Sequence, residues 1–180
     1  MSEVQTFDFI YKGGASKRYH TCRTLKTQDI AAHSFGVAML CELITGGRAR
    51  KELLMAALCH DLAEHIVGDI PSPAKRSLGI SEQFGGYEMS ILNANGLGGY
   101  EASLSRDEQV VLKYADIIDG MMFCLTELRY GNKHLCEVFK NFHSYAVQLK
   151  ETTGVDFPVA QEIVDKISKE YREEITHVYS

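Results

Sequence analysis

The sequence predicts an all-α, single-domain fold for its 180 residues. Apolar side chains recur at helical spacing along most of the chain, and no β-branched segment alternates apolar and polar residues over five positions, as a strand would. Only three prolines occur, and two of them, Pro71 and Pro73, lie in one loop. With 45% hydrophobic residues, the chain is long enough for one sizeable core. We therefore expect one helical bundle over residues 1–180.

Charge and composition exclude several classes of protein. The net charge is −5 and no long basic tract occurs, which argues against a binder of nucleic-acid polymers. The first residues lack the basic and apolar regions of a signal peptide, and no run of about 18 apolar residues could span a membrane. Five cysteines are widely spaced without a Cys-x-x-Cys pair, so we expect small buried thiols. The expected location is the cytoplasm.

The N-terminal third contains two helices and a basic segment between them. Residues 3–11 have apolar side chains at helical spacing. Residues 16–27 have none, and carry four cations within ten residues. This segment is either a solvated loop or an approach for an anion, in which Arg18 forks onto a phosphate and Tyr19 lies against a sugar or base. The next helix, predicted from Asp29 to Thr45, has His33 in its apolar stripe, where a lone histidine is more often a core residue than a ligand.

The central helix is predicted over residues 48–67, and it places ionisable side chains on an apolar surface. His60 and Asp61 are adjacent, and Glu64 lies one turn beyond them, so all three project towards one region. Buried unpaired carboxylates cost several kcal/mol, which calls for a compensating cation. Imidazole and carboxylate ligands together suit Zn, Fe, Mn or Co. A loop over residues 68–80, with at most one helical turn, then carries Asp69 and Lys75.

The second half of the chain is predicted to be helical over residues 81–94, 105–130, 132–149 and 158–175, with a flexible joint at 96–99. Ser105 and Glu108 form a capping box at the start of the helix over residues 105–130. That helix is apolar nearly all round, and its Asp116 faces inward. Asp119 lies about 60° away around the helix axis, so it either supports the site from behind or points to water. The last two helices serve packing or subunit contact, and a homo-oligomer is expected.

His33, the His60-Asp61 pair and Asp116 thus lie on three separate helices, in an order that resembles the HD-domain metal-dependent phosphohydrolases. The stretches at 32–34, 60–75 and 114–116 resemble the 5′-deoxynucleotidase branch and short phage enzymes that hydrolyse deoxynucleotides, dATP triphosphohydrolases among them. The resemblance covers roughly residues 15 to 120. Two departures are Ala32, where the bacterial nucleotidases have glutamate, and Tyr19, where they have tryptophan.

The resemblance implies a ligand set and a cofactor. His33, His60, Asp61 and Asp116 would bind one divalent transition metal, Co, Mn or Zn, and a second, Mg-like ion could accompany the substrate phosphates. Two imidazoles and two carboxylates leave a +2 ion neutral overall, with room for water and phosphate.

The resemblance also implies roles for residues around the metal. Glu64 would act as general base or position the water, and Asp69 would lie across the phosphate as acid or orienting group; the sequence leaves this division open. Arg18 and Lys75 would neutralise the phosphate. Tyr19 would crowd C2′ of the sugar.

The expected activity is hydrolysis of the α-phosphate ester of a small-molecule deoxynucleotide, in a bacterial cell or phage-infected host. The products would be deoxynucleoside plus tripolyphosphate from a triphosphate such as dATP, or plus phosphate from a monophosphate. The length of the anion pocket decides between them, and depends on where Arg23, Lys26 and Lys75 point. The alternatives are a non-catalytic metal- and nucleotide-binding regulatory module, and a plain structural bundle.

Overall fold

The computed structural model describes residues 2–179, with side chains through His177, and confirms the all-α class. No strand occurs in residues 2–179; the sole β contact is an isolated bridge between Lys17 and Asp29. The helices, in chain order, are α1 (Glu3–Gly14), α2 (Ile30–Ile44), α3 (Lys51–Cys59), α4 (Glu64–Val67), α5 (Ser72–Ser77), α6 (Ser81–Ala94), α7 (Gly99–Ala102), α8 (Arg106–Arg129), α9 (Cys136–Thr153) and α10 (Pro158–Tyr179).

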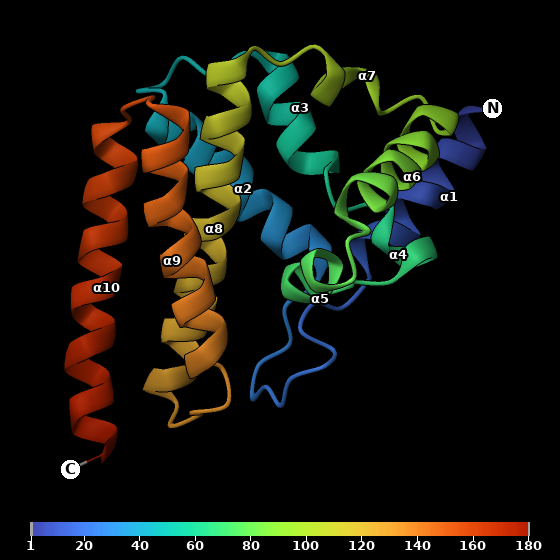
Figure 1. The fold of residues 1–180 in the computed structure, drawn as a ribbon. Helices are drawn as coiled ribbons and strands as arrows, with labels where there is room; N and C mark the ends of the chain where they lie inside the picture. Colours follow the sequence, from blue (N-terminus) through green and yellow to red (C-terminus); the bar gives the residue numbers. More distant parts are fainter. Residues whose placement is uncertain (1, 180) are drawn as a thin grey trace.

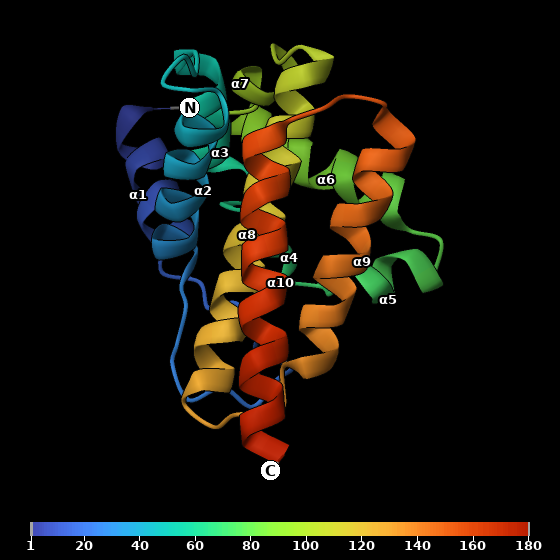
Figure 2. The ribbon, with the colours of Figure 1, turned by 90° about the vertical axis from the view of Figure 1, so that its left-hand side faces the viewer.

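Helix α8 is the centre of the molecule. Its N-terminus has the predicted capping box, in which the Ser105 hydroxyl accepts from the backbone of Glu108 and the Glu108 side chain accepts from the backbone of Ser105. Helices α2, α9 and α10 all pack against α8, so it is buried on most sides. Figure 2 shows α10 lying along α8 over most of its length. A helix enclosed in this way holds any side chain that it presents to a site in a fixed position.

A second, smaller group of buried side chains lies beside this bundle and supports the segment after α3. It joins Phe9 of α1, Leu62 and Ala63 of the segment, and Ile91 of α6. Gly13 lets α1 approach closely, because a Cβ at that position would lie 2.7 Å from the Leu62 carbonyl oxygen. Helix α1 therefore holds the segment that carries His60 and Asp61.

The predicted helix 48–67 is interrupted, and the interruption lies in the candidate site. Helix α3 ends at Cys59, and residues 60–63 form tight turns before α4. In these turns Leu62 N–H donates to the Cys59 carbonyl (3.0 Å) and Glu64 N–H to the Asp61 carbonyl (3.0 Å), the bonding of a 3₁₀ turn. Helix α4 then ends at Gly68, which has φ of 81°.

Other boundaries differ in smaller ways. The predicted loop 68–80 contains α5, and the predicted joint at 96–99 leads directly into the single turn of α7. Helix α9 begins at Cys136 rather than at residue 132. No described helix is both long and apolar enough to cross a lipid bilayer. Of the five cysteines, all free, Cys41, Cys59 and Cys124 are buried and the other two are half-buried.

The close approach at Gly13 predicts opposite effects for two neighbouring glycines of α1. Gly13→Ala should lower the free energy of unfolding by about 1–3 kcal/mol, because its Cβ would overlap the Leu62 backbone. Gly14→Ala meets only the Ala31 Cβ at 3.4 Å, so the higher helix propensity of alanine should leave stability unchanged or raised. Urea denaturation of both variants measures the difference, and equal stabilities would contradict the packing of α1 described here.

Candidate metal centre and active site

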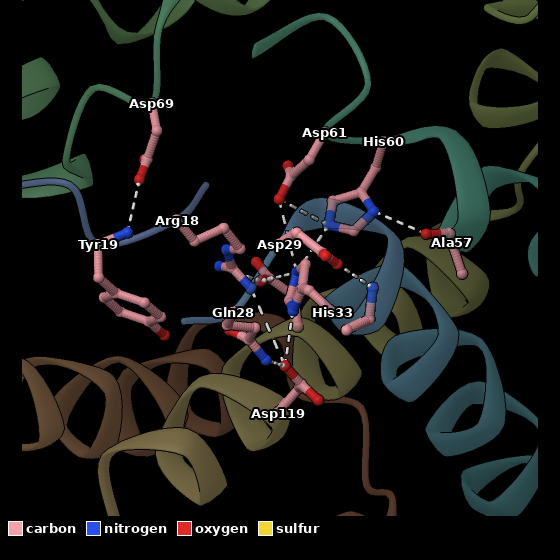
Figure 3. Close-up of polar contacts among 12 residues, drawn as sticks. Arg18, Tyr19, Gln28, Asp29, His33, Ala57, His60, Asp61, Asp69 and Asp119 are labelled. Atoms are coloured by element: carbon pink, nitrogen blue, oxygen red, sulfur yellow. Dashed lines mark hydrogen bonds and ion pairs between the residues drawn. The ribbon is translucent and has the colours of Figure 1, made fainter. Parts of the chain in front are cut away.

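Four predicted metal ligands converge, although they come from three parts of the chain. His33 belongs to α2, His60 and Asp61 to the turn after α3, and Asp116 to α8. The Nε2 atom of His33 lies 3.3 Å from Nε2 of His60, 3.5 Å from Oδ2 of Asp61 and 3.4 Å from Oδ1 of Asp116. Nε2 of His60 lies 3.3 Å from Oδ2 of Asp61 (Figure 3). The donor atoms thus surround one small space.

The remaining nitrogen of each ring fixes which atom faces that space. Nδ1 of His60 lies 2.8 Å from the Ala57 carbonyl oxygen, which can only accept, so Nδ1 carries the proton. Nδ1 of His33 lies 2.6 Å from Oδ2 of the Asp119 carboxylate, so this Nδ1 also carries a proton and donates it. In the neutral rings both Nε2 lone pairs therefore point at each other and at two carboxylates. This arrangement is repulsive unless a positive charge lies among the four atoms.

The pKa shifts of His33 and Asp116 reflect the same need for positive charge in the cluster. Burial opposes protonation of His33, but its contacts with Asp116 and Asp119 outweigh burial and raise its pKa. Burial also opposes ionisation of Asp116, yet Lys113 and the His33 ring hold the pKa of that carboxyl well below its usual range. A proton on His33 or a cation among the ligands can satisfy the cluster.

The donor set fits a divalent transition metal. Two donors bonded to one ion at about 2.1 Å lie roughly 3.0–3.4 Å apart, close to the separations found here. Two neutral imidazoles and two carboxylates balance a +2 charge and match the preferences of Zn, Mn and Co. His33, His60 and Asp116 can each bring one ligand atom within 4.8 Å of the others.

The structure decides between the two roles predicted for Asp119, which were supporting the site and pointing to water. Asp119 does not point to water: its Oδ2 accepts from Nδ1 of His33 at 2.6 Å and from Nε2 of Gln28 at 2.8 Å. A carboxylate behind a ligating histidine fixes the tautomer and makes the other ring nitrogen a better donor. Asp119 therefore orients His33.

Arg18 brings a cation to the same space. Its guanidinium lies 3.8 Å from Asp116 and 3.9 Å from Asp119, and its buried Nη1 has no hydrogen-bond partner. Burial opposes its charge, but Tyr19 and then the nearby carboxylates raise the pKa of Arg18 further above its ordinary value. The side chain is thus charged, with an N–H group left to donate to an anion.

Glu64 lies at the start of α4, next to the cluster. Its buried Oε2 has no hydrogen-bond partner. Burial, followed by the charges of Asp61 and Asp69, raises the pKa of Glu64 to about 9, against the opposing effects of Arg18 and Lys75. A cation that neutralised Asp61 would remove part of this shift and favour the ionised carboxylate.

A hydrogen bond joins Asp69 to Tyr19, the residue next to Arg18 (Figure 3). The Tyr19 N–H donates to Oδ2 of Asp69 at 3.1 Å, and Nδ1 of His20 lies 3.6 Å from the same oxygen. Tyr19 has φ of 57°, a left-handed conformation that costs free energy in a non-glycine residue. Its ring stacks on Phe123 with centroids 4.6 Å apart. Asp69 thus shapes the segment that carries Arg18.

Lys75, predicted to bind phosphate, points towards α6 in this structure. Its Nζ donates to Oε1 of Glu88 at 2.9 Å and lies 4.1 Å from the centroid of the Phe84 ring. Lys75 is near enough to the site for its charge to lower the pKa of Glu64 slightly, against the larger effect of burial. Its role in phosphate binding stays a prediction.

Lys113 and Glu127 are two residues that sequence reasoning missed. Lys113 Nζ donates to Oδ2 of Asp116 at 3.1 Å, and its position one turn before Asp116 was a usable signal. A cavity of about 450 Å³ begins at His60 and Asp116 and extends along α8 past Lys113 to Arg106. Glu127 had no such signal, because two of its three partners are backbone groups about a hundred residues away and the third, the Asn132 amide, follows the end of the helix.

A family model described as "5′-deoxynucleotidase YfbR-like" matches residues 7–171. The chain belongs to this family. Membership confirms the predicted enzyme class, a phosphohydrolase, and the resemblance on which that prediction rested. The YfbR-like relatives include the 5′-deoxynucleotidase YfbR of Salmonella typhi, 24% identical over 89% of this chain and 90% of that protein. A 5′-deoxynucleotidase of Photobacterium profundum is 22% identical over 87% of this chain and 91% of its own length.

Solved structures share the fold. The HD phosphohydrolase DatZ of cyanophage S-2L, bound to dA and one catalytic Zn²⁺ ion, has a TM-score of 0.73 with 21% identity, covering 96% of this chain and 98% of its own. An HD-domain phosphohydrolase of Listeria innocua has a TM-score of 0.70 with 19% identity, covering 99% of both chains. The HD-type helical bundle predicted from the sequence is therefore confirmed.

The position of Asp119 behind His33 predicts a loss of metal affinity when it is removed. Asp119→Ala should weaken binding of Zn²⁺ or Mn²⁺ by about 10- to 100-fold, because the His33 ring loses its orientation and part of its basicity. Competition with a chromogenic chelator gives the affinity. Asp165→Ala, which removes an exposed carboxylate from α10, is the matched control. Equal metal affinity in the two variants would show that Asp119 does not act on the ligand.

Proposed function

We propose that this YfbR-like protein is a metal-dependent hydrolase of deoxynucleotides that cleaves the ester between the 5′ oxygen and the α-phosphorus. The observation that carries the proposal is the convergence of His33, His60, Asp61 and Asp116 within 3.3–3.5 Å contacts, with the unpartnered guanidinium nitrogen of Arg18 beside them. Such a cluster needs a cation, and together with Arg18 it could receive a phosphate.

We infer that His33, His60, Asp61 and Asp116 hold one divalent transition metal. When bound, such an ion supplies the Lewis acidity that polarises a phosphoryl oxygen and makes a water molecule more acidic. Zinc is supported by the Zn²⁺ of the cyanophage protein; Co and Mn suit the same ligands. A second, Mg-like ion would need ligands beyond these four and would depend on the substrate phosphates.

The protein's own groups would then carry the proton transfers and the charge. Glu64, with a buried oxygen free of partners, would accept the proton of the attacking water. Arg18 would donate to a non-bridging phosphate oxygen, where charge resides in a loose transition state. Asp69 would orient Arg18 through the Tyr19 backbone or protonate the leaving 5′ oxygen. Lys75 would have to leave Glu88 to reach the phosphate.

A triphosphate substrate is supported by the cavity that leads away from the ligands. It runs along α8 from Asp116 to Lys113 and then to Arg106, so cations face the direction in which β- and γ-phosphates would extend. The helical rise of about 1.5 Å per residue places Lys113 and Arg106 roughly 5 and 15 Å along α8 from Asp116, a range that long side chains and a triphosphate could bridge. Adenine as the base rests on likeness to the cyanophage protein, which binds dA.

We further propose that the protein acts as a homo-oligomer with no polymer or membrane partner. Phe35, Met39 and Leu43 of α2 are each more than half exposed and follow one another at four-residue spacing. Such a stripe favours self-association through α2, whereas the last two helices, predicted to serve packing or subunit contact, pack on α8.

The proposed function predicts that hydrolysis of deoxynucleotides requires both the metal and Glu64. The wild type, supplied with Mn, Co, Zn or Mg, should hydrolyse deoxynucleoside mono- or triphosphates, and chelation should abolish this activity. Glu64→Gln should retain metal but lose about 10²-fold or more in kcat, because the water has no base. Chromatography distinguishes phosphate from tripolyphosphate as product. Metal binding without turnover of any deoxynucleotide would favour the regulatory module instead.

The stacking of Tyr19 predicts selection against ribose. An aromatic ring against C2′ would reject a 2′-hydroxyl and supply about 1–3 kcal/mol of discrimination, roughly ten- to a hundredfold in kcat/KM. Tyr19→Ala should reduce this preference, whereas Arg18→Ala should weaken all nucleotides alike, since phosphate is common to them. Competition between dATP and ATP, or dAMP and AMP, gives the ratio. Equal use of both sugars by the wild type would remove Tyr19 from this role.

A further inference from the structure

A second cavity lies at the end of the bundle where α8 meets α9, away from the metal ligands. Its volume is about 510 Å³. One wall is the end of the basic segment, Arg23, Thr24 and Leu25, and the other is the α8–α9 connection, Tyr130 to His134. Figure 1 shows the loop after α1 reaching down to this end of α8. We name it the Arg23–His134 cavity.

The cavity has a basic lining in a chain of net charge −5. Arg23, Lys133 and His134 line it, and no aspartate or glutamate does. A fourth basic residue, Lys26, has its Nζ 5.3 Å from the centroid of the Tyr130 ring. Among the described residues, Arg23 and Lys26 form no ion pair with a carboxylate. Because no carboxylate is paired with the Arg23 or Lys26 side chain, both can donate to an anion.

An aromatic side chain lies among these cations. Tyr130 is 58% exposed and presents its ring to the cavity beside Lys26. An exposed ring surrounded by basic groups offers stacking to a planar base and ionic contacts to phosphates at the same time.

The floor of the cavity is rigid. Glu127, fully buried, accepts from the backbone N–H groups of Leu25 and Lys26 at 2.7 Å each. The Nδ2 atom of Asn132 donates to Glu127 and, at 2.8 Å, to the Arg23 carbonyl oxygen. Both oxygens of Glu127 are therefore committed beneath the surface, and the basic side chains remain above it. A preformed floor lowers the entropy lost when a ligand binds.

From this combination we infer that the Arg23–His134 cavity binds a nucleoside phosphate, with the phosphates against Arg23 and Lys26 and the base on Tyr130. This site is distinct from the proposed active site and does not depend on turnover there. It is connected to that site through the chain: Arg18 and Tyr19 lie four to five residues before Arg23, and the Cys22 N–H donates to the Tyr19 carbonyl at 2.8 Å. A ligand that bridges the loop and the α8–α9 connection would hold this segment in place.

The test measures ATP binding by titration calorimetry, with all arms made in full-length Glu64→Gln protein so that the ligand stays intact. Adding Arg23→Gln with Lys26→Gln should remove a binding event, or weaken it by about tenfold or more. Adding Arg18→Gln should leave that event unchanged. The matched control is Lys166→Gln with Lys169→Gln, which removes two exposed lysines from α10 and should also leave it unchanged.

A second pair of titrations separates the nucleoside from its phosphates. Tyr130→Ala should weaken ATP severalfold and leave inorganic tripolyphosphate unaffected. Tripolyphosphate binding as tightly as ATP to the unmodified cavity would overturn the nucleoside assignment. Unchanged ATP binding after the Arg23 and Lys26 substitutions would overturn the site itself, as would binding of single-stranded oligothymidylate without binding of ATP. None of these outcomes depends on whether the metal centre hydrolyses deoxynucleotides.

Discussion

The concentration of negative charge around His33 is the constraint on which the rest of the structure depends. Asp61, Asp116 and Asp119 each place an oxygen within 3.5 Å of its ring nitrogens, and the ring itself is fully buried. Carboxylates so placed repel one another strongly, and the imidazoles, Arg18, Lys113 and a further cation offset the repulsion. Helices α2 and α8, the turn after α3 and the basic loop are all held in the positions that this balance requires.

Sequence reasoning identified the metal-type residues because their chemistry is unusual in an apolar helical stripe. It could not see the break at His60, because 3₁₀ turns there are favoured by packing against α1 and α6 rather than by a glycine or proline. The orientation of the Asp119 side chain was equally ambiguous. A rotation of about 60° around the helix axis, which separates it from Asp116, is enough to turn a side chain from the core towards solvent. The role of Asp119 became clear only when Gln28 and His33, from another part of the chain, were placed against it.

The basic segment illustrates a different limit. Its composition is that of a solvated loop, and nothing in residues 16–27 indicates a fixed conformation. The fixing groups are remote: Asp69 takes the Tyr19 N–H, and Glu127 takes those of Leu25 and Lys26. Sequence patterns report periodicity within a segment, whereas these contacts join residues 50 to about 100 positions apart. The segment proposed to bind phosphate is therefore held in place by residues that no local sequence pattern could connect to it.

The anchoring of the loop by Glu127 has a consequence for motion. A surface loop ordinarily exchanges its amide protons with solvent freely, but here two of them point into a fully buried carboxylate. The Leu25 and Lys26 amides can exchange only when the loop detaches from α8, while exposed neighbours such as Thr27 exchange without that step. The loop is thus attached to the rest of the molecule at two places, through Tyr19 to Asp69 and through Leu25 and Lys26 to Glu127.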